Sequence, residues 1–238
     1  MLGAAKFRPD PSVLADVPLF AGLDGAARQD VLADAHVKRI AKGDPVFEQG
    51  APAAAFFVLL DGHVKAVQTT AAGQQVVVHV VRPGEFFGCV SLMGETHYPA
   101  TALALCESLA LTWSVPSLKK LVERHPAITA NALAGMGARM RDMRARFREI
   151  STERVERRIA HGLLRLAHHS GRKTAEGVEV DFPLTRQDIA DMTGATLHTV
   201  SRTLAKWEGD GILDGGRRRI VIRQPHRLVA IAEELDAS

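Results

Sequence analysis

The 238-residue chain is 46% hydrophobic and carries a formal net charge of +3, which suits two domains with real cores and permits nucleic-acid binding without requiring it. Its two cysteines, Cys89 and Cys106, exclude a disulfide framework. The N-terminus lacks the apolar stretch of a signal peptide, and the apolar runs fall short of the roughly 20 residues of a membrane span. We therefore expect a cytoplasmic protein that does not associate with membranes.

The first half of the chain predicts a small helix followed by a β-rich domain. Asp24 is a suitable N-cap for a short helix that runs to about Ala35 and forms a lid on the β-rich domain. From residue 37 to residue 115, β-prone runs alternate with glycine turns about every ten residues. The runs are 46–47, 56–60, 64–67, 76–81 and 100–113. This pattern is typical of a β-barrel or jelly roll.

A short helix over residues 117–126 ends at a hinge, and the next helix carries a narrow apolar seam. Its apolar residues recur at spacings of three and four, as the a and d positions of a heptad do. A helix packed only on its own domain would show a wider stripe, so the seam predicts a dimer, and the charge positions below are those of a parallel pair. The predicted interface consists of Leu133, Met136, Met140, Met143, Phe147 and Ile150.

Two properties of this seam indicate an adjustable dimer. Arg139 would lie opposite Arg144 of the partner subunit, and like charges weaken a coiled coil. Methionine fills three of the six seam positions and repacks easily. Such a helix pair is suited to switching between arrangements.

A new domain is predicted to begin near residue 151. We expect Thr152 to cap a helix that buries Val155, Ile159, Leu163 and Leu166, followed by a loop over 170–177 and a strand over 178–182. A final helix that begins at Pro225 is expected to serve packing only.

Residues 185–213 predict two short helices joined by a tight turn. Thr185 and Thr196 are suitable N-caps, and Gly194 can adopt the positive φ that ends the first helix. In the second helix, Val200, Leu204 and Trp207 recur at helical spacing and must face a core. The other side is polar and then cationic, which suits a helix inserted in a DNA major groove: His198, Thr199, Ser201, Arg202 and Lys206.

A basic hairpin comes after the second helix. Residues 214–223 place a glycine turn and the consecutive residues Arg217, Arg218 and Arg219 between β-prone runs. Arginines at such a turn would contact phosphates and add affinity without sequence information. A solvated helical hairpin is the alternative, but the added wing favours a winged DNA-binding domain.

The pattern T-R-Q-D-I-A-x-x-x-G-x-x-x-x-T-V-S-R-x-L over 185–204, followed by G-I-L, resembles the DNA-binding end of the CRP/FNR family of bacterial regulators. Glycines 43, 50, 62, 84 and 88 and P-L-F-x-x-L at 18–23 also match the cyclic-nucleotide-binding β-roll of that family. The resemblance covers about residues 14–231. It implies an α+β fold with a β-roll effector domain (1–126), a dimerisation helix (127–150) and a winged helix-turn-helix domain (151–238).

The resemblance also implies roles on DNA. The arginine that matches Arg202 reads a guanine in the family, and the position of Ser201 helps to read the half-site. Histidine stands at His198, where the family usually has glutamate, so a different target base is expected. The predicted DNA-binding residues are Thr185, Arg186, Thr196, His198, Thr199, Ser201, Arg202, Lys206, Arg217, Arg218 and Arg219.

The predicted effector pocket departs from that of the cyclic-AMP binders. Cys89 occupies the position of their ribose-binding glutamate, and residues 98–101 lack their phosphate-binding arginine. A buried cyclic phosphate would be left without a counter-charge, so we expect no physiological binding of cyclic AMP. An iron-sulfur cluster needs four ligands, and the chain has two cysteines. The pocket residues are Gly84, Phe87, Gly88, Cys89, Val90, Ser91, Leu92, Tyr98 and Thr101.

Two alternatives to an unidentified effector remain, namely haem-dependent sensing of nitric oxide or redox state, and no ligand at all. Tyr98 to Ala102 is similar to a Y-x-A-T-A segment of the branch that responds to nitrogen oxides, thought to act through haem, for which the candidate ligands are His36, His63, His79 and His97. The other alternative is a ligand-independent regulator with a pocket filled by Phe86, Phe87, Leu92, Met93 and Tyr98.

We expect a homodimeric regulator that is controlled by an effector other than cyclic AMP at the β-roll, binds pseudo-palindromic double-stranded DNA and contacts RNA polymerase. A β-barrel enzyme of the cupin type is disfavoured because the strands contain no metal-ligand cluster, so we expect no enzymatic activity.

Overall fold

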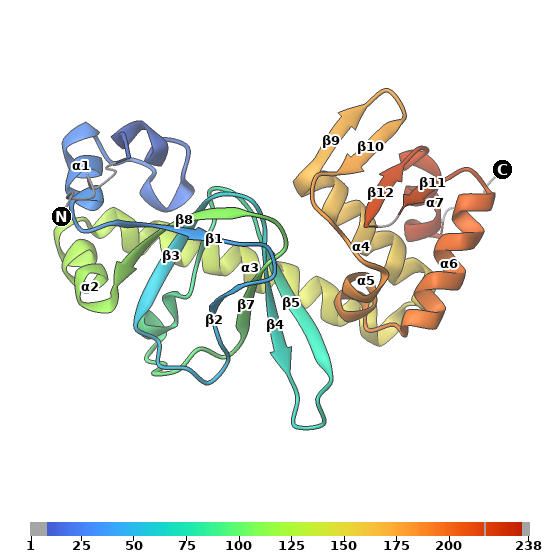
Figure 1. Cartoon of the computed structure of the whole chain (residues 1–238), viewed down its shortest axis with the longest axis horizontal. Coiled ribbons are helices and arrows are strands. Elements are labelled where there is room, and N and C mark those ends of the chain that lie inside the picture. Colours follow the sequence, from blue (N-terminus) through green and yellow to red (C-terminus); the bar gives the residue numbers. More distant parts are fainter. Residues whose placement is uncertain (1–8, 217, 235–238) are drawn as a thin grey trace, which may run out of the picture. The chain divides into compact units, whose positions relative to one another are not determined.

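The computed structural model describes residues 9–216 and 218–234, which form two compact units (Figure 1). One unit takes in residues 9–66 and 79–140, and the other takes in 67–78 and the described residues from 141 onward. The long helix α3 (Pro126–Thr152) belongs to the first unit up to Met140 and to the second from Arg141.

The β-roll consists of two four-stranded sheets. In the first sheet the order is β1 (His36–Ile40), β8 (Ser108–Ser114), β3 (Ala55–Asp61) and β6 (Phe86–Phe87). In the second it is β2 (Pro45–Phe47), β7 (Thr101–Ala104), β4 (Val64–Thr69) and β5 (Gln75–Val81). All five predicted runs are strands, although the run 100–113 is divided into β7 and β8. Sequence analysis missed β1 and β6.

Side-chain alternation along β3 separates two cores. Phe57 and Leu59 point into the roll, where they pack with buried residues of the second sheet such as Ala102. Phe56 and Val58 point to the outer face, where helices cover the sheet. Neighbouring residues of this strand therefore belong to different cores, and the roll interior is defined by one face of the first sheet.

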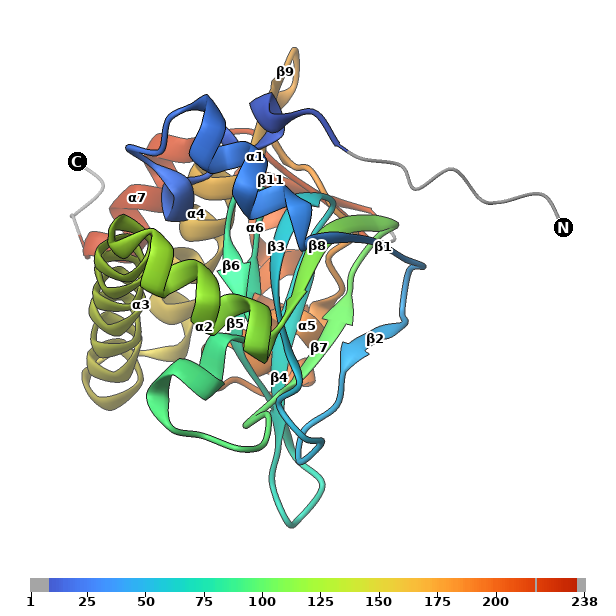
Figure 2. The same cartoon turned by 90° about the vertical axis from the view of Figure 1, so that its left-hand side faces the viewer.

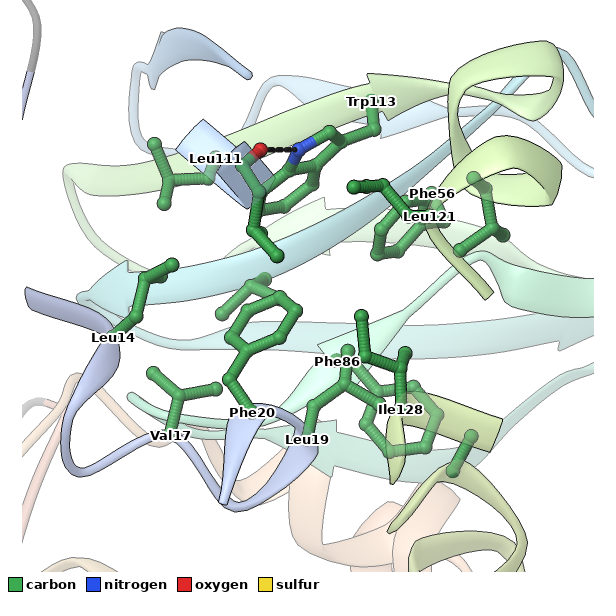
Figure 3. Packing of buried hydrophobic residues seen from close by; sticks show 14 of the residues in the cluster. Leu14, Val17, Leu19, Phe20, Phe56, Phe86, Leu111, Trp113, Leu121 and Ile128 are labelled. Atoms are coloured by element: carbon green, nitrogen blue, oxygen red, sulfur yellow. Dashed lines mark hydrogen bonds between the residues drawn. The ribbon is translucent and has the colours of Figure 1, made fainter. Parts of the chain in front are cut away.

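The outer core lies under helices α1 (Gly25–Ala33), α2 (Val115–Arg124) and the beginning of α3, which contribute buried side chains to one cluster (Figures 2 and 3). Asp24 caps α1 as predicted, accepting from the Ala27 amide at 2.8 Å. Trp113 is fully buried, stacks on Phe56 at 4.8 Å between ring centroids, and donates its indole N–H to the Val31 carbonyl at 2.8 Å. The helix expected to cover the β-domain is thus anchored to it.

Helix α3 exposes most of the predicted seam. The exposed fractions are 63% for Leu133, 45% for Met140, 55% for Met143, 72% for Phe147 and 51% for Ile150. The sixth seam residue, Met136, is partly buried against the outer core. In the described part of the chain, no helix is both long and apolar enough to cross a membrane.

The second unit is a winged helix-turn-helix. Helices α4 (Val155–Ser170), α5 (Arg186–Thr193), α6 (Leu197–Gly209) and α7 (Pro225–Glu233) accompany a sheet of order β11 (Leu213–Gly216), β12 (Arg219–Ile222), β10 (Gly177–Val180) and β9 (Gly171–Thr174). The α4 residues Ile159 and Leu163 are fully buried, as is Trp207 of α6, whose indole N–H donates to Glu156 at 3.3 Å.

Two predictions for this unit were wrong. Thr152 does not cap α4, because it is the last residue of α3 and its hydroxyl donates to the Arg148 carbonyl at 2.8 Å. The N-cap is Arg154, which makes no side-chain capping bond. The predicted loop 170–177 contains β9, which pairs with β10 in a hairpin. Pairing across the sheet supplies this strand, and its polar sequence G-R-K-T gave no β pattern.

Candidate DNA-binding surface and effector pocket

Local capping fixes both helices of the helix-turn-helix as predicted. The Thr185 hydroxyl accepts from the Asp188 amide at 3.0 Å, and the Asp188 carboxylate accepts from the Thr185 amide at 3.0 Å, which completes a capping box. Gly194 ends α5 with a φ of 62°. Thr196 caps α6 by accepting from the Thr199 amide at 3.1 Å. Short-range hydrogen bonds therefore determine where α6 begins and how its first turn is oriented.

The two sides of α6 differ as the sequence predicts. Val200 and Trp207 are fully buried and Leu204 is 2% exposed, so this side is fixed in the core. His198 and Arg202 are exposed on the other side. Within the described part of the chain, neither of these two side chains has an intramolecular hydrogen-bond or ion-pair partner. Their donors are therefore available to a ligand outside the chain.

Two further cations of the predicted surface are paired on the outside of the domain. Arg186 lies 3.3 Å from the Glu208 carboxylate, and Lys206 lies 3.2 Å from Glu156. Both cations remain more than two-fifths exposed, and exposed ion pairs are worth less than about 1 kcal/mol. Either side chain can leave its partner for a phosphate at small cost.

The wing, which is the hairpin of β11 and β12, is held by ion pairs. Arg219 donates to Glu179 at 2.8 Å and to Glu176 at 3.4 Å, and its hydrogen bond lowers the pKa of the Glu179 carboxyl. Arg218 is exposed in the turn, where its φ is 71°. Arg217 lies outside the described residues. Arg219 thus holds β12 to β10, a role that the sequence did not indicate, and its predicted phosphate contact stays a prediction.

Sequence analysis missed one exposed apolar residue of α6. Leu197, the first residue of the helix, is 47% exposed and lies next to His198. Helical periodicity would place Leu197 on the buried side, because it lies three residues before Val200, and so gave no hint of its exposure. Its exposure shows that the buried side of α6 begins only at Val200.

Four aromatic rings pack against one another in the β-roll. Phe47 stacks on Tyr98 with ring centroids 3.8 Å apart, and Phe47 also lies 5.6 Å from Phe57 and 6.0 Å from Phe87. Tyr98, Phe57 and Phe87 are each no more than 5% exposed. We call Phe47, Phe57, Phe87 and Tyr98 the aromatic plug.

Hydrogen bonds and backbone shape hold this plug in place. The Tyr98 hydroxyl donates to the Ala55 carbonyl at 2.6 Å and accepts from the Ala55 amide at 3.1 Å, so both functions of the hydroxyl are satisfied. Gly88 has a φ of 72°, and a side chain there would meet Phe47 and Phe57 at little more than 3 Å. The predicted pocket residue Thr101 accepts from the Gln49 amide at 2.9 Å, beside the plug.

The other predicted pocket residues separate into a buried and an exposed group. Cys89 is 6% exposed and burial raises the pKa of its thiol, while Gly84, Val90 and Ser91 are partly buried. Leu92 and Met93, in the 3-10 helix Cys89–Met93, are 39% and 52% exposed, and Phe86 packs in the outer core. The expectation that these three residues fill the pocket was therefore wrong.

Arg139 of α3 approaches the same segment. Its guanidinium donates to the Phe86 carbonyl and lies over the Phe86 ring, 4.5 Å from the centroid. Burial lowers the pKa of this guanidinium, partly offset by the nearby Cys89 and Glu85. The sequence places Arg139 beside the dimer seam, opposite a like charge, whereas the fold directs it to β6.

Glu85 sits in an ion cluster next to β6. Its carboxylate is bonded to His79 at 2.9 Å and to Arg82. Burial raises the pKa of this carboxyl, but the hydrogen bond and charge of His79 and the charge of Arg82 outweigh burial and bring the pKa to about 2. The group is therefore an anion at any physiological pH.

Comparison with known families finds a match for the β-roll and for the helix-turn-helix part of the chain. A cyclic nucleotide-binding domain model matches residues 37–125, and a Crp-like helix-turn-helix domain model matches residues 157–231, so the two segments span more than half of the chain. The chain belongs to the CRP/FNR family of transcription regulators. It is therefore a DNA-binding regulator with an effector-binding type of domain, and this family is not an enzyme family.

Relatives of this CRP/FNR regulator match it along most of its length. The Cyclic AMP receptor protein of Thermus thermophilus is 28% identical over 90% of this chain and 96% of that protein. The Transcriptional activator protein anr of Pseudomonas aeruginosa is 25% identical over 84% of this chain and 82% of that protein. The structure of FixK2 from Bradyrhizobium japonicum, 24% identical, shares the fold with a TM-score of 0.73 over 83% of this chain and 96% of that chain.

The candidate haem ligands of this CRP/FNR regulator do not converge. His36 and His97 are exposed, His63 is buried, and His79 is bonded to Glu85. Among the described residues, no group of three or more His, Cys, Asp and Glu side chains could hold a metal ion.

Proposed function

We propose that this regulator acts as a homodimer that reads a pseudo-palindromic DNA site through α6. The observation that carries the proposal is the outer side of α6, where His198 and Arg202 are exposed while the opposite side is fixed in the core. An exposed arginine on a helix of this kind can contact a guanine edge with two hydrogen bonds. Two such helices related by a two-fold axis would read half-sites whose centres are about 34 Å apart.

The exposed Leu197 extends this proposal. An apolar side chain at the beginning of a recognition helix can contact the methyl group of a thymine. We assign it that role beside His198, whose imidazole has one donor and one acceptor when neutral. Ser201 keeps its expected part in reading the half-site. The remaining predicted contacts are assigned to phosphates or to orientation of these readers: Thr185, Arg186, Thr196, Thr199, Lys206, Arg218 and Arg219.

The apolar stripe on α3 supports the dimer. Five of its six residues are at least 45% exposed, and the stripe runs along the helix at heptad spacing. A large exposed apolar stripe marks an interaction surface. We assign its partner as the same stripe of a second copy, and we retain 1–126, 127–150 and 151–238 as the functional divisions of the chain.

We further propose that the β-roll does not bind cyclic AMP. Cys89 offers a protonated thiol where the ribose would need a carboxylate, and Tyr98 lies against Phe47 within the roll. The aromatic plug favours the ligand-independent alternative over haem or nitric oxide sensing. Contact with RNA polymerase is also part of the proposed function, as the means of regulating transcription.

The DNA-binding part is tested by selecting duplexes from a random pool with the purified protein. A pseudo-palindrome with the expected half-site spacing should emerge, and its affinity should exceed that for random duplex by at least about a thousandfold. Equal affinity for the selected and the random duplex would rule out sequence-specific regulation. Absorption spectra taken with added haem, and calorimetry with cyclic AMP, should both show no binding.

The dimer is tested by Phe147→Glu, the change of the most exposed residue in the stripe. Two buried charges at the symmetric contact should weaken self-association by about a thousandfold, in addition to the lost apolar burial. Sedimentation velocity measures the change. Arg148→Glu, one residue along the same helix and outside the stripe, is the matched control and should leave the dimer intact. A wild-type monomer at micromolar concentration would contradict the proposal.

A further inference from the structure

The junction between α3 and α4 lies beside the turn of the helix-turn-helix. Helix α3 ends at Thr152, and Arg154 is extended, with a ψ of 150°, before α4 begins at Val155. The N-cap residue Arg154 makes no side-chain capping bond at this break. The junction therefore lacks a side-chain cap of the kind that fixes α5 and α6. Its side-chain contacts come from α4, where Arg157 and His161 lie 3.8 Å and 3.5 Å from the Glu153 carboxylate.

Arg158 supplies three hydrogen bonds at this place. Its guanidinium donates from Nε to the Thr193 carbonyl at 2.9 Å and from Nη2 to the Gly194 carbonyl at 3.1 Å. The third bond runs from Nη1 to the Glu153 carbonyl at 3.1 Å. One planar group thus joins the last carbonyls of α5 to the junction that precedes α4.

The chemistry of these acceptors calls for arginine. The final carbonyls of a helix lack intrahelical partners and carry partial negative charge, which a cation stabilises. Three carbonyls that converge from two segments match the planar fork of a guanidinium, whereas an ammonium would have to choose among them. The bonds therefore fix an orientation as well as a contact.

Close packing makes the same region stiff. A side chain at Gly162, one turn after Arg158 on α4, would lie 3.0 Å from the Thr193 methyl group. The Thr193 hydroxyl is in turn bonded to the Ile189 carbonyl at 2.7 Å. A displacement of the junction therefore moves the end of α5, and with it the capped beginning of α6.

From these contacts we propose that Arg158 is a positioning residue that couples the α3–α4 junction to the helix-turn-helix turn and so sets how α6 is presented to DNA. The proposal rests on the proposed DNA-reading function of α6. Arg158 would then connect the end of α3 to α6 without itself contacting DNA.

The neighbouring Arg157 provides a matched control. It too donates to the end of a helix, from Nε to the Ala232 carbonyl of α7 at 2.9 Å. Its other partners are carboxylates, Glu234 at 3.1 Å and Glu153 at 3.8 Å, so both arginines contact Glu153. Arg158→Gln and Arg157→Gln remove the same charge and comparable bonds from adjacent positions of α4. They differ in which helix end is released.

The first measurement compares the affinities for a selected duplex and a random duplex. Arg158→Gln should reduce this ratio by about 10- to 100-fold, the size expected when a bidentate base contact is misaligned, while random-duplex affinity stays within about threefold. Arg157→Gln should change the ratio by less than about threefold. Equal losses in the two variants would overturn the proposal. A wild-type protein that binds all duplexes equally would overturn the proposed function and this proposal together.

A double-mutant cycle separates positioning from general damage. If Arg158 acts through α6, the losses from Arg158→Gln and Arg202→Ala should be strongly non-additive, whereas those from Arg157→Gln and Arg202→Ala should add. Additivity in both cycles would overturn the proposal.

Arg158→Lys tests whether the planar guanidinium is needed, and it replaces Arg158→Gln in these measurements if the glutamine variant does not fold. Its charge is kept, so its selectivity should fall while its thermal unfolding stays close to wild type. Hydrogen exchange at the Ala195 amide, which is bonded to the Ala190 carbonyl at 3.1 Å, should become faster in this variant. Full selectivity and unchanged exchange in the lysine variant would overturn the proposal.

Discussion

The outer side of α6 and the interior of the β-roll are the two places where this regulator could meet a ligand, and they are in opposite states. On α6, His198 and Arg202 are exposed, and their donors have no partner among the described residues. In the roll, the Tyr98 hydroxyl is saturated with hydrogen bonds and its ring is stacked on Phe47. One site presents exposed donors, and the other is lined by aromatic side chains packed against one another.

Under the proposed function, the family fold keeps its DNA-binding surface while the interior of its effector domain is closed by its own side chains. The exposed surface of α6 is positioned by the caps of α5 and α6 and by the buried side of α6. The roll needs only to be filled, and aromatic side chains can fill it as well as a nucleotide can. A regulator with such a roll would depend on its own packing to set the DNA-binding state.

The largest expected effect on the β-roll comes from removing the Tyr98 ring from the aromatic plug. Tyr98→Ala should lower the free energy of unfolding by about 3 to 5 kcal/mol, because it leaves a cavity and two unpaired backbone groups on Ala55. Urea unfolding measures the loss. Small aromatic compounds should bind the variant and restore part of the stability, as apolar cavities accept such ligands.

Tyr98→Phe is the control for the plug, since it keeps the ring and removes the hydroxyl. It should cost about 1 to 3 kcal/mol, and it should not respond to the same compounds. A Tyr98→Ala protein as stable as wild type would show that the roll interior is open and that the comparison fails.

Acid should weaken the roll through Glu85. Its pKa of about 2 is below its ordinary value of 4.5, so the group stabilises the fold above pH 4.5 and loses this contribution as the pH falls from 4.5 towards 2. The loss should reach about 2 to 3 kcal/mol. Chemical unfolding between pH 7 and pH 2 measures it.

The matched variant for this test is Glu85→Gln, which should be less stable than wild type at pH 7 and should show a flatter dependence over the same pH range. Glu95→Gln changes an exposed carboxyl of the same unit and should keep the wild-type slope. If Glu85→Gln keeps the full acid sensitivity, the ion cluster with His79 and Arg82 does not fix this part of the roll.

On the exposed side of α6, Arg202 should contribute to discrimination between bases. Arg202→Ala should lose about 1 to 3 kcal/mol of discrimination at one base pair of each half-site and little elsewhere. Competition binding with single-base variants of the selected site measures this. Arg218→Ala in the wing should instead weaken all sequences alike and reduce the salt slope by about 1. A uniform loss from Arg202→Ala would contradict its assignment as a base reader.

The sequence alone was sufficient where structure depends on neighbouring residues. Thr185, Gly194 and Thr196 act through atoms three or four positions away, so the boundaries of α5 and α6 and the buried side of α6 could be predicted. The same holds for the turns of the roll, where glycines with positive φ separate β-prone runs. The family pattern added the order of the domains.

Only the tertiary structure decided the features that depend on distant partners. The strands β1 and β6 exist because β8 and β3 pair with them. Arg139 is directed to Phe86, Arg219 to Glu179, and Arg158 to the end of α5, and each bond joins segments at least 35 positions apart in the chain. A long cationic side chain has many accessible rotamers and no local partner that selects one. The chain must fold before the acceptors converge, and that convergence sets the role of each arginine.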